Sequence, residues 1–247
     1  MDADKAVLAV LSDVHQGLNN RRYLRETVDF LLDLGPRCKV VLGGDATNTT
    51  TRTSKGNVLE EWASGEEQIL TLADDIRPLK DSGQLVAITS GNHPNRMYND
   101  VFVNPEMMIA SILGDRTLYI GEMGIIYFNV NNNLYVHYIL HRHRKTEGYY
   151  DYFNADVTWL EHFHAPKAVP SVIIEHNKYQ KKPIAKQVWS LWQGSFQEYP
   201  NYSKASGNRP LLTGYWLCEM TGNDKKKEVT PYLDHTYRGM IEGGYRL

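Results

Sequence analysis

Short apolar runs recur along the chain, and turn residues and polar side chains follow directly after several of them. The clearest runs span Val7–Leu11, Val40–Leu42, Leu85–Ser90, Leu134–Leu140 and Val157–Leu160. A short apolar run that is closed by turn residues predicts a buried β-strand. In open α/β sheets, ligands bind beyond the carboxyl ends of such strands. Polar groups that are scattered through the first two thirds of the sequence can therefore meet at one edge of one sheet system.

Two amphipathic segments separate the first three predicted strands. The first begins near Arg22 and ends at Gly35-Pro36, and the second spans about Val58–Lys80. In both segments the apolar residues recur at three-to-four spacing, which predicts helices. The first third of the chain therefore has the order β-α-β-α-β, which favours parallel strands.

The second half of the chain is richer in strand-like runs. Ile125–Val130 and Leu134–Leu140 flank three asparagines and predict a hairpin. Further runs span Val172–His176, Ile184–Leu191 and Leu211–Thr221. These runs therefore predict a mostly antiparallel sheet in the second half of the chain. Because no low-complexity linker separates the halves, we expect a single domain over residues 1–247, in which residues 166–247 complete the second sheet.

Composition narrows the range of partners and compartments. The chain has 27 Lys and Arg against 29 Asp and Glu, a formal net charge of −2, so no global positive field draws it to nucleic acid or membrane. No apolar stretch approaches the roughly 20 residues that a membrane span needs, and no secretory signal is visible. The two cysteines, Cys38 and Cys218, predict buried free thiols. We expect a cytoplasmic protein with no membrane partner and make no prediction of its oligomeric state.

The polar residues after five of the apolar runs are of the types that bind metal ions. They are Asp13 and His15, Asp45, Asn92 and His93, His141, and His162 and His164. A pair of divalent cations can polarise a phosphoryl group and clamp both its attacking and its leaving oxygen. Mixed imidazole, carboxylate and amide ligation suits manganese, iron(II) or zinc better than magnesium or calcium. The pattern predicts a two-metal phosphoesterase.

The order of these motifs resembles that of the calcineurin-like metallophosphoesterases, in particular their small bacterial and phage-type members. Their order is D-x-H, G-D-x-x-[DN], G-N-H, H and G-H-x-H, and this chain follows it over residues 6–165 with Glu161 in place of the usual last glycine. The resemblance implies an α/β fold, namely a four-layer αββα sandwich of two mixed β-sheets packed face to face with flanking helices. It also implies a dimetal site at the carboxyl ends of the strands.

The resemblance further implies a role for each matching residue. One metal would be bound by Asp13, His15 and His164, the other by Asn92, His141 and His162, and Asp45 would bridge them. His93 matches the catalytic histidine, which reaches the phosphate or the leaving-group oxygen. The implied reaction is in-line attack by a metal-bound hydroxide. We expect two divalent ions, with Mn²⁺ first and Fe²⁺, Zn²⁺ or a mixed pair as alternatives.

Three histidines compete for the fourth motif. His137, His141 and His143 all lie at or near the end of one predicted strand. The family's fourth ligand sits immediately after its strand, which favours His141. His143 is the runner-up, or a substrate contact.

Residues around the motifs bear on the catalytic histidine and on substrate binding. Asn48 stands where some relatives carry an aspartate that pairs with the catalytic histidine, so we expect it behind the metal ligands, orienting His93 less firmly than a carboxylate would. Arg96, Arg142 and His143 are candidate contacts to an anionic substrate.

The favoured function is hydrolysis of a phosphodiester, with a phosphate ester such as a nucleotide or nucleic acid as the binding partner. One alternative is a DNA nuclease of the SbcD/Mre11 type, although such nucleases usually carry additional capping and dimerisation regions. The other alternative is a metal-binding interaction scaffold without catalysis. Such scaffolds typically lose the catalytic histidine, whereas His93 is present in this chain.

Overall fold

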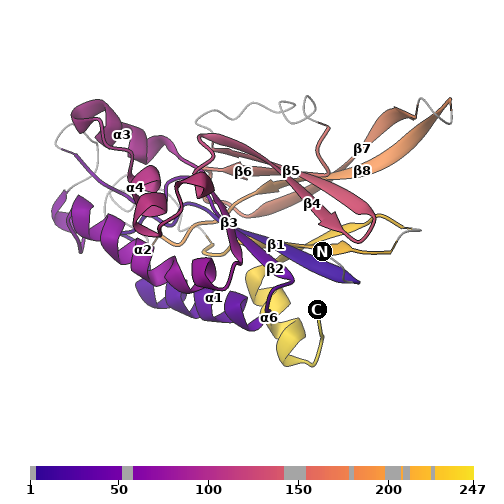
Figure 1. Cartoon of the computed structure of the whole chain (residues 1–247), viewed down its shortest axis with the longest axis horizontal. Coiled ribbons are helices and arrows are strands. Elements are labelled where there is room, and N and C mark those ends of the chain that lie inside the picture. Colours follow the sequence, from indigo (N-terminus) through magenta and orange to yellow (C-terminus); the bar gives the residue numbers. More distant parts are fainter. Residues whose placement is uncertain are drawn as a thin grey trace.

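Two five-stranded β-sheets pack face to face in the computed structural model (Figure 1). The structure describes residues 4–51, 58–141, 154–177, 181–197, 207, 212–223 and 226–247. The first sheet has the order β10 (Val229–Leu233), β9 (Trp216–Thr221), β1 (Lys5–Leu11), β2 (Cys38–Leu42) and β3 (Leu85–Ile88). The second sheet has the order β4 (Met123–Val130), β5 (Asn133–His141), β6 (Val157–Glu161), β8 (Lys182–Trp192) and β7 (Lys167–Asn177).

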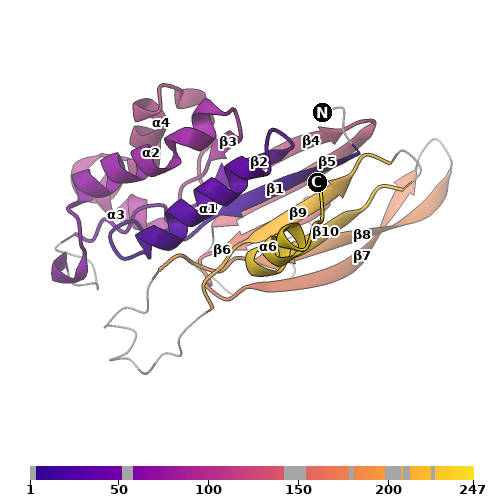
Figure 2. The ribbon, with the colours of Figure 1, turned by 90° about the horizontal axis from the view of Figure 1, so that it is seen from below.

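Helices cover the outer face of the first sheet (Figures 1 and 2). They are α1 (Arg21–Asp33), α2 (Gly65–Asp81), α4 (Pro105–Ile112) and α6 (Asp234–Glu242), while α3 (Asn92–Val101) follows β3. Two short 3-10 helices, η1 (Val58–Glu60) and η2 (Arg116–Leu118), lie in the connections. Within the described part of the chain, no helix has the length and apolar character that crossing a membrane requires.

Two apolar cores hold the layers together. Leu24, Leu31 and Ile69 of the helices pack on Val7 and Val40 of the first sheet. A second core between the sheets includes Leu8, Val10, Val41, Tyr135 and Trp159. Successive residues of a strand point to opposite faces, so β1 contributes to both cores and is buried along almost its whole length. Cys38 and Cys218 are buried and free, as predicted.

The predicted α/β class, with two mixed sheets and flanking helices, is confirmed. The parallel pairing of β1 with β2 and of β2 with β3 is also confirmed. A small apolar cluster of Tyr138, Leu140, Ala155 and Leu160 lies apart from the two main cores. Among the elements described, none forms the fourth, helical layer that we expected outside the second sheet.

The prediction that residues 166–247 complete the second sheet is wrong for their last part. Of the strands described in this range, only β7 and β8 join that sheet, whereas β9 pairs antiparallel with β1, with Lys5 opposite Thr221, and β10 pairs with β9. β1 is apolar on both faces and needs a partner along its second edge. β9 supplies that partner. Its Leu217 faces the helix-side core and its Cys218 faces the core between the sheets, so β9, like β1, is apolar on both faces. Hydrophobic periodicity identifies such a strand but not the sheet that it joins.

Two further predictions need smaller corrections. The second sheet is not mostly antiparallel, because β6 pairs in parallel with both β5 and β8. The second helix begins at Gly65 rather than near Val58. Its start is fixed by a capping box, in which the Ser64 hydroxyl accepts from the backbone of Glu67 and the Glu67 carboxylate accepts from the backbone of Ser64.

Candidate metal centre

The loops that follow five strands bring all the predicted ligand side chains to one edge of the two sheets. The β1 loop carries Asp13 and His15, the β2 loop carries Asp45, and α3 after β3 begins with Asn92 and His93. His141 is the last residue of β5, and His162 and His164 follow β6. Backbone hydrogen bonds of 2.9 Å from Asp13 to Gly44 and from His15 to Asp45 tie the first two loops together.

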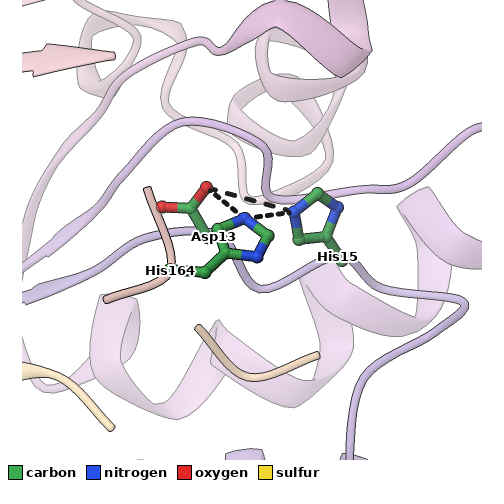
Figure 3. Close-up of side chains that lie close together, drawn as sticks. All are labelled: Asp13, His15 and His164. Atoms are coloured by element: carbon green, nitrogen blue, oxygen red, sulfur yellow. Dashed lines mark hydrogen bonds and ion pairs between the residues drawn. The ribbon is translucent and has the colours of Figure 1, made fainter. Parts of the chain in front are cut away.

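Asp13, His15 and His164 form the first group of candidate ligands (Figure 3). Nε2 of His164 lies 3.0 Å from Oδ1 of Asp13 and 3.2 Å from Nε2 of His15. The latter nitrogen is 4.0 Å from the same Asp13 oxygen. Two imidazole nitrogens and a carboxylate oxygen that point at one another offer three lone pairs to a common centre, which is the donor set of a bound cation.

Asp45 belongs to both of the other groups of candidate ligands. One group joins it to His141 and His162, and the other joins it to His15 and His93. Oδ2 of Asp45 lies 3.1 Å from Nε2 of His141, which is itself 2.9 Å from Oδ1 of Asn92. Apart from the imidazole nitrogens of His141 and His93, this buried Asp45 oxygen has no hydrogen-bonding partner among the described residues. A buried carboxylate oxygen that faces only imidazole nitrogens, which are themselves metal donors when neutral, is well satisfied by a cation, so the arrangement fits a bridging ligand.

The other oxygen of Asp45 is fixed by the protein. Oδ1 accepts a hydrogen bond of 2.7 Å from the backbone N–H of His93. A Cβ on Gly91 would stand 2.2 Å from this oxygen, so only glycine allows the chain to pass so closely. The Gly-Asn-His motif therefore needs its glycine because the carboxylate of Asp45 occupies the space that a side chain would take.

Five residues of the centre have left-handed backbone conformations. Their φ angles are 51° for Asp13, 50° for His15, 53° for Asp45, 81° for His162 and 52° for His164. Non-glycine residues rarely have positive φ, although Asp, Asn and His do so more often than others. Such strain gathers at functional sites, where the surrounding structure holds it in place. The backbone turns sharply at each of these residues and directs its side chain toward the common centre.

Burial and mutual attraction set the charges of these side chains. Burial raises the pKa of Asp13, but the attraction and hydrogen bond of His164 outweigh it and hold that pKa at about 2. Burial likewise opposes ionisation of Asp45, yet the nearby His141 and His93 hold its pKa well below the usual range. Burial lowers the pKa of His15 well below its ordinary value, as do the charges of His93 and His164. Ionised carboxylates and a neutral His15 are forms that bind metal ions, whereas burial of His141 is outweighed by the attraction of Asp45, which raises the pKa of that ring above its ordinary value.

Asn48 contacts two histidines in different ways. Its side-chain Oδ1 lies 3.2 Å from Nδ1 of His15, and its main-chain oxygen lies 3.2 Å from Nδ1 of His93. Its Nδ2 donates to Thr50 at 2.8 Å and to Glu61. From the sequence we predicted that Asn48 would lie behind the metal ligands with its side chain toward His93. The structure instead places the amide behind His15 and the main chain beside His93.

Of the three histidines that compete for the fourth motif, His141 lies in the centre. His137 is fully buried between the sheets, where Nε1 of Trp159 donates to its Nδ1 at 3.2 Å and its Nε2 lies 3.1 Å from the sulfur of Met220. His143 lies outside the described residues, as does Arg142.

Arg96 is placed beside the histidine that the motifs mark as catalytic. It lies one turn along α3 from His93, with guanidinium nitrogens 3.4 Å from Nδ1 and 3.2 Å from Nε2 of that ring. Its positive charge and burial both lower the pKa of His93, burial being the larger cause. Contact of Arg96 with a substrate stays a prediction.

Two buried glutamates in and near the centre were not among the predicted site residues. Oε2 of Glu161 accepts a hydrogen bond of 2.9 Å from the backbone of Gly44 and lies 3.3 Å from Nδ1 of His141. Glu106 of α4 lies 3.4 Å from the hydroxyl of Ser90, and burial raises its pKa to about 8. The only signal for Glu161 in the sequence is a carboxylate where the resembling family has glycine. Glu106 has no signal, because it looks like any polar residue of an amphipathic helix.

The known proteins compared with this chain are distant from it in sequence. No family model matches the chain, and no curated protein gives a significant match. Among solved structures it is similar to a novel archaeal phosphodiesterase, with 13% identity, a TM-score of 0.44 and coverage of 92% of this chain and 99% of that one. It is also similar to Vps29 from Cryptosporidium parvum, with 12% identity, a TM-score of 0.46 and coverage of 94% and 98%. Vps29 from Entamoeba histolytica, complexed with zinc, has 13% identity, a TM-score of 0.39 and coverage of 92% and 98%. Similarities at this level assign no activity.

Proposed function

We propose that this protein is a two-metal phosphoesterase of the calcineurin-like kind that acts on phosphodiesters. The observation that carries the proposal is the position of Asp45, whose carboxylate belongs to two groups of candidate ligands and turns one buried oxygen toward the imidazole nitrogens of His141 and His93. A shared carboxylate with imidazoles on both sides is the donor arrangement that a dimetal phosphoesterase requires.

The candidate ligands divide into two sets around Asp45. Asp13, His15 and His164 would hold one ion. Asn92, His141 and His162 would hold the other, and Asp45 would contact both. The mixture of nitrogen and oxygen donors favours Mn²⁺, with Fe²⁺, Zn²⁺ or a mixed pair as alternatives. When bound, such ions neutralise charge on the phosphoryl oxygens and provide the nucleophile at neutral pH.

His93 is the candidate acid for the leaving group. Its Nδ1 faces the main-chain oxygen of Asn48, which can only accept, so Nδ1 carries a proton. The other nitrogen, Nε2, lies 3.9 Å from Asp45 and 3.2 Å from a guanidinium nitrogen of Arg96, which can only donate, so Nε2 carries the lone pair of the neutral ring. Burial and the charge of Arg96 lower the pKa of His93, so the proposed acid role requires that an anionic substrate draws Arg96 toward itself and that Nε2 takes up the proton that it would donate to the leaving oxygen.

The choice of a diester over a monoester rests on charge and on the resemblance. Arg96 supplies one positive charge beside His93, and a diester carries one negative charge on its phosphate. The motif order also resembles small members of the family. A DNA nuclease is the alternative substrate class, and a metal-binding scaffold without activity is the alternative of a different kind.

The test is an assay of metal-stimulated hydrolysis. Wild type would be incubated with and without Mn²⁺ on a nitrophenyl phosphodiester, a nitrophenyl phosphomonoester, cyclic nucleotides, and single- and double-stranded DNA. We expect Mn²⁺-dependent hydrolysis of diesters. Asp45→Asn should lose more than the roughly 10–100-fold that is typical of residues behind metal ligands.

Asp74→Asn is the matched control, because Asp74 is an exposed aspartate of α2 whose ion pair among the described residues is the local one with Arg77. Cleavage of DNA but not of small diesters would favour the nuclease. Metal binding without hydrolysis of any ester would favour the scaffold and contradict the proposed function.

A further inference from the structure

We propose that Glu161 is a positioning residue that fixes the ring orientation and tautomer of His141, and so tunes one of the two metal sites. The proposal rests on the proposed function in so far as His141 is a metal ligand. It concerns the one position at which this chain departs from the last motif of the family that it resembles, by having Glu161 where glycine is usual.

The carboxylate of Glu161 is enclosed behind the ring of His141. Glu161 is fully buried at the end of β6, and its neighbour across the parallel β5–β6 pair is His141 itself. Its Oε2 lies 3.3 Å from Nδ1 of His141 and accepts a 2.9 Å hydrogen bond from the backbone N–H of Gly44. The same oxygen therefore connects the ends of β2, β5 and β6.

The two nitrogens of His141 face different partners. Nε2 lies 2.9 Å from Oδ1 of Asn92 and 3.1 Å from Oδ2 of Asp45, on the side of the metal centre. Nδ1 faces Glu161, on the opposite side of the ring. A carboxylate accepts and does not donate, so it selects the tautomer with the proton on Nδ1 and the lone pair on Nε2. The ring stands between the carboxylate and the metal groups, so Glu161 acts through His141 and not as a ligand.

A carboxylate behind a ligating histidine is a recognised way to tune a metal site. It fixes the ring, sets the tautomer and raises the basicity of the ligating nitrogen, and removing it typically weakens metal affinity by about 10–100-fold. A glycine at this position would leave Nδ1 of His141 without that partner.

Two glycines make room for the pair. A Cβ on Gly43 would stand 2.2 Å from Oε1 of Glu161 and 2.6 Å from Cβ of Ser12. A Cβ on Gly44 would stand 2.7 Å from Nδ1 of His141. The Gly-Gly step before Asp45 is therefore matched to the Glu161–His141 pair, and any side chain at position 43 would displace the carboxylate.

The experiment measures metal binding and not hydrolysis. Metal-free wild type, Glu161→Gln, Glu161→Ala and Gly43→Ala would be titrated calorimetrically with Zn²⁺ and with Mn²⁺. We expect two bound ions in the wild type, and in Glu161→Ala a weakening of one site by about 10–100-fold with the other site unchanged. Glu161→Gln keeps the shape and one acceptor, so its loss should be smaller. Gly43→Ala should weaken the same site with the carboxylate still present, but its Cβ would also meet Ser12, which donates to Asp13, so Glu161→Ala is the variant that tests whether the other site stays unchanged.

A second readout reports the ring itself. In zinc-loaded protein with ¹⁵N-labelled histidine, the Nδ1–H proton of His141 should give a slowly exchanging signal that Glu161→Ala removes. Glu219→Gln is the matched control, because Glu219 of β9 pairs with Lys5 and accepts hydrogen bonds from Tyr237 and Tyr245, none of which is a candidate ligand. This control should keep both affinities and the His141 signal.

Failure of this proposal can be told apart from failure of the proposed function. Unchanged affinity at both sites in folded Glu161→Ala and Glu161→Gln, with the His141 signal retained, would overturn the positioning role and leave the phosphoesterase proposal standing. A wild type that binds two ions, shows the Glu161 effect and hydrolyses no ester would contradict the phosphoesterase proposal while supporting the role of Glu161.

Discussion

The side-chain oxygen of Asn48 lies 3.2 Å from Nδ1 of His15, whereas His93 meets only the main-chain oxygen of Asn48, also at 3.2 Å. One residue thus holds a candidate metal ligand through its side chain and the candidate acid through its backbone. Substitution of Asn48 can change the first contact and leave the second in place. The two roles are therefore separable by experiment.

Asn48→Ala should weaken metal binding without altering the titration of His93. Losing the amide behind His15 is expected to reduce affinity at the Asp13, His15 and His164 site by roughly tenfold, at the low end for such partners. The apparent pKa seen in the pH dependence of kcat should stay the same, because the carbonyl of residue 48 remains. Calorimetric titration and a pH–rate profile measure the two effects.

Thr50→Val is the control for this prediction, since it removes the hydroxyl that Asn48 Nδ2 contacts without touching His15. A shifted pH–rate profile with unchanged metal affinity would show that the side chain of Asn48 serves His93 after all.

His93→Gln should lower kcat and leave two ions bound. Nε2 of His93 is 3.9 Å from the nearest Asp45 oxygen, farther than His141 is, and its Nδ1 faces the Asn48 carbonyl. Loss of a general acid typically costs about 10²–10⁴ in rate. Because His93 also belongs to one group of candidate ligands, the bound-ion count decides its role. A variant that binds only one ion would make His93 a ligand.

How much of this centre could be predicted from the sequence depends on how far apart along the chain the contacting residues lie. Asp13, Asp45 and His164 were predictable because each follows an apolar run, and strand ends meet at one sheet edge. The contact between Gly44 and Glu161 spans 117 positions and leaves no local pattern. The same limit applies to β9, whose periodicity predicts a strand but does not say that it would pair with β1.

The buried His137 should make the protein less stable in mild acid. Burial lowers its pKa to about 3, whereas in the unfolded chain it titrates near about 6.5. The unfolded state therefore binds more protons below about pH 6.5, and this one group should reduce the free energy of unfolding by up to about 1.4 kcal/mol per pH unit. This loss of stability is absent above about pH 6.5 and grows as the pH falls toward about 3.

His137→Gln should remove this dependence, because its amide oxygen can still accept from Trp159 but does not titrate in this range. Urea unfolding of both metal-free proteins from pH 7 to about pH 5 measures the difference, and the gap between them should narrow as the pH falls. Parallel curves would show that His137 is not the group responsible.

Because the backbone at His164 is left-handed, we expect His164→Gly to be more stable than His164→Ala. Its φ is 52°, a conformation that costs a residue with a Cβ about 1–2 kcal/mol and costs glycine little. His164→Gly and His164→Ala both remove the ligand, so the difference between them reports the backbone. In metal-free protein, the glycine variant should be more stable than the alanine variant by about 1 kcal/mol.

His141 provides the comparison, because it ends strand β5, where glycine costs stability relative to alanine. At that position the order should reverse, with His141→Ala more stable than His141→Gly. Urea unfolding of the four variants, each with metal removed, tests the pair of predictions together. If alanine were the more stable residue at both positions, the left-handed turn at His164 would not be a source of strain, and the sharp turns of the centre would need another explanation.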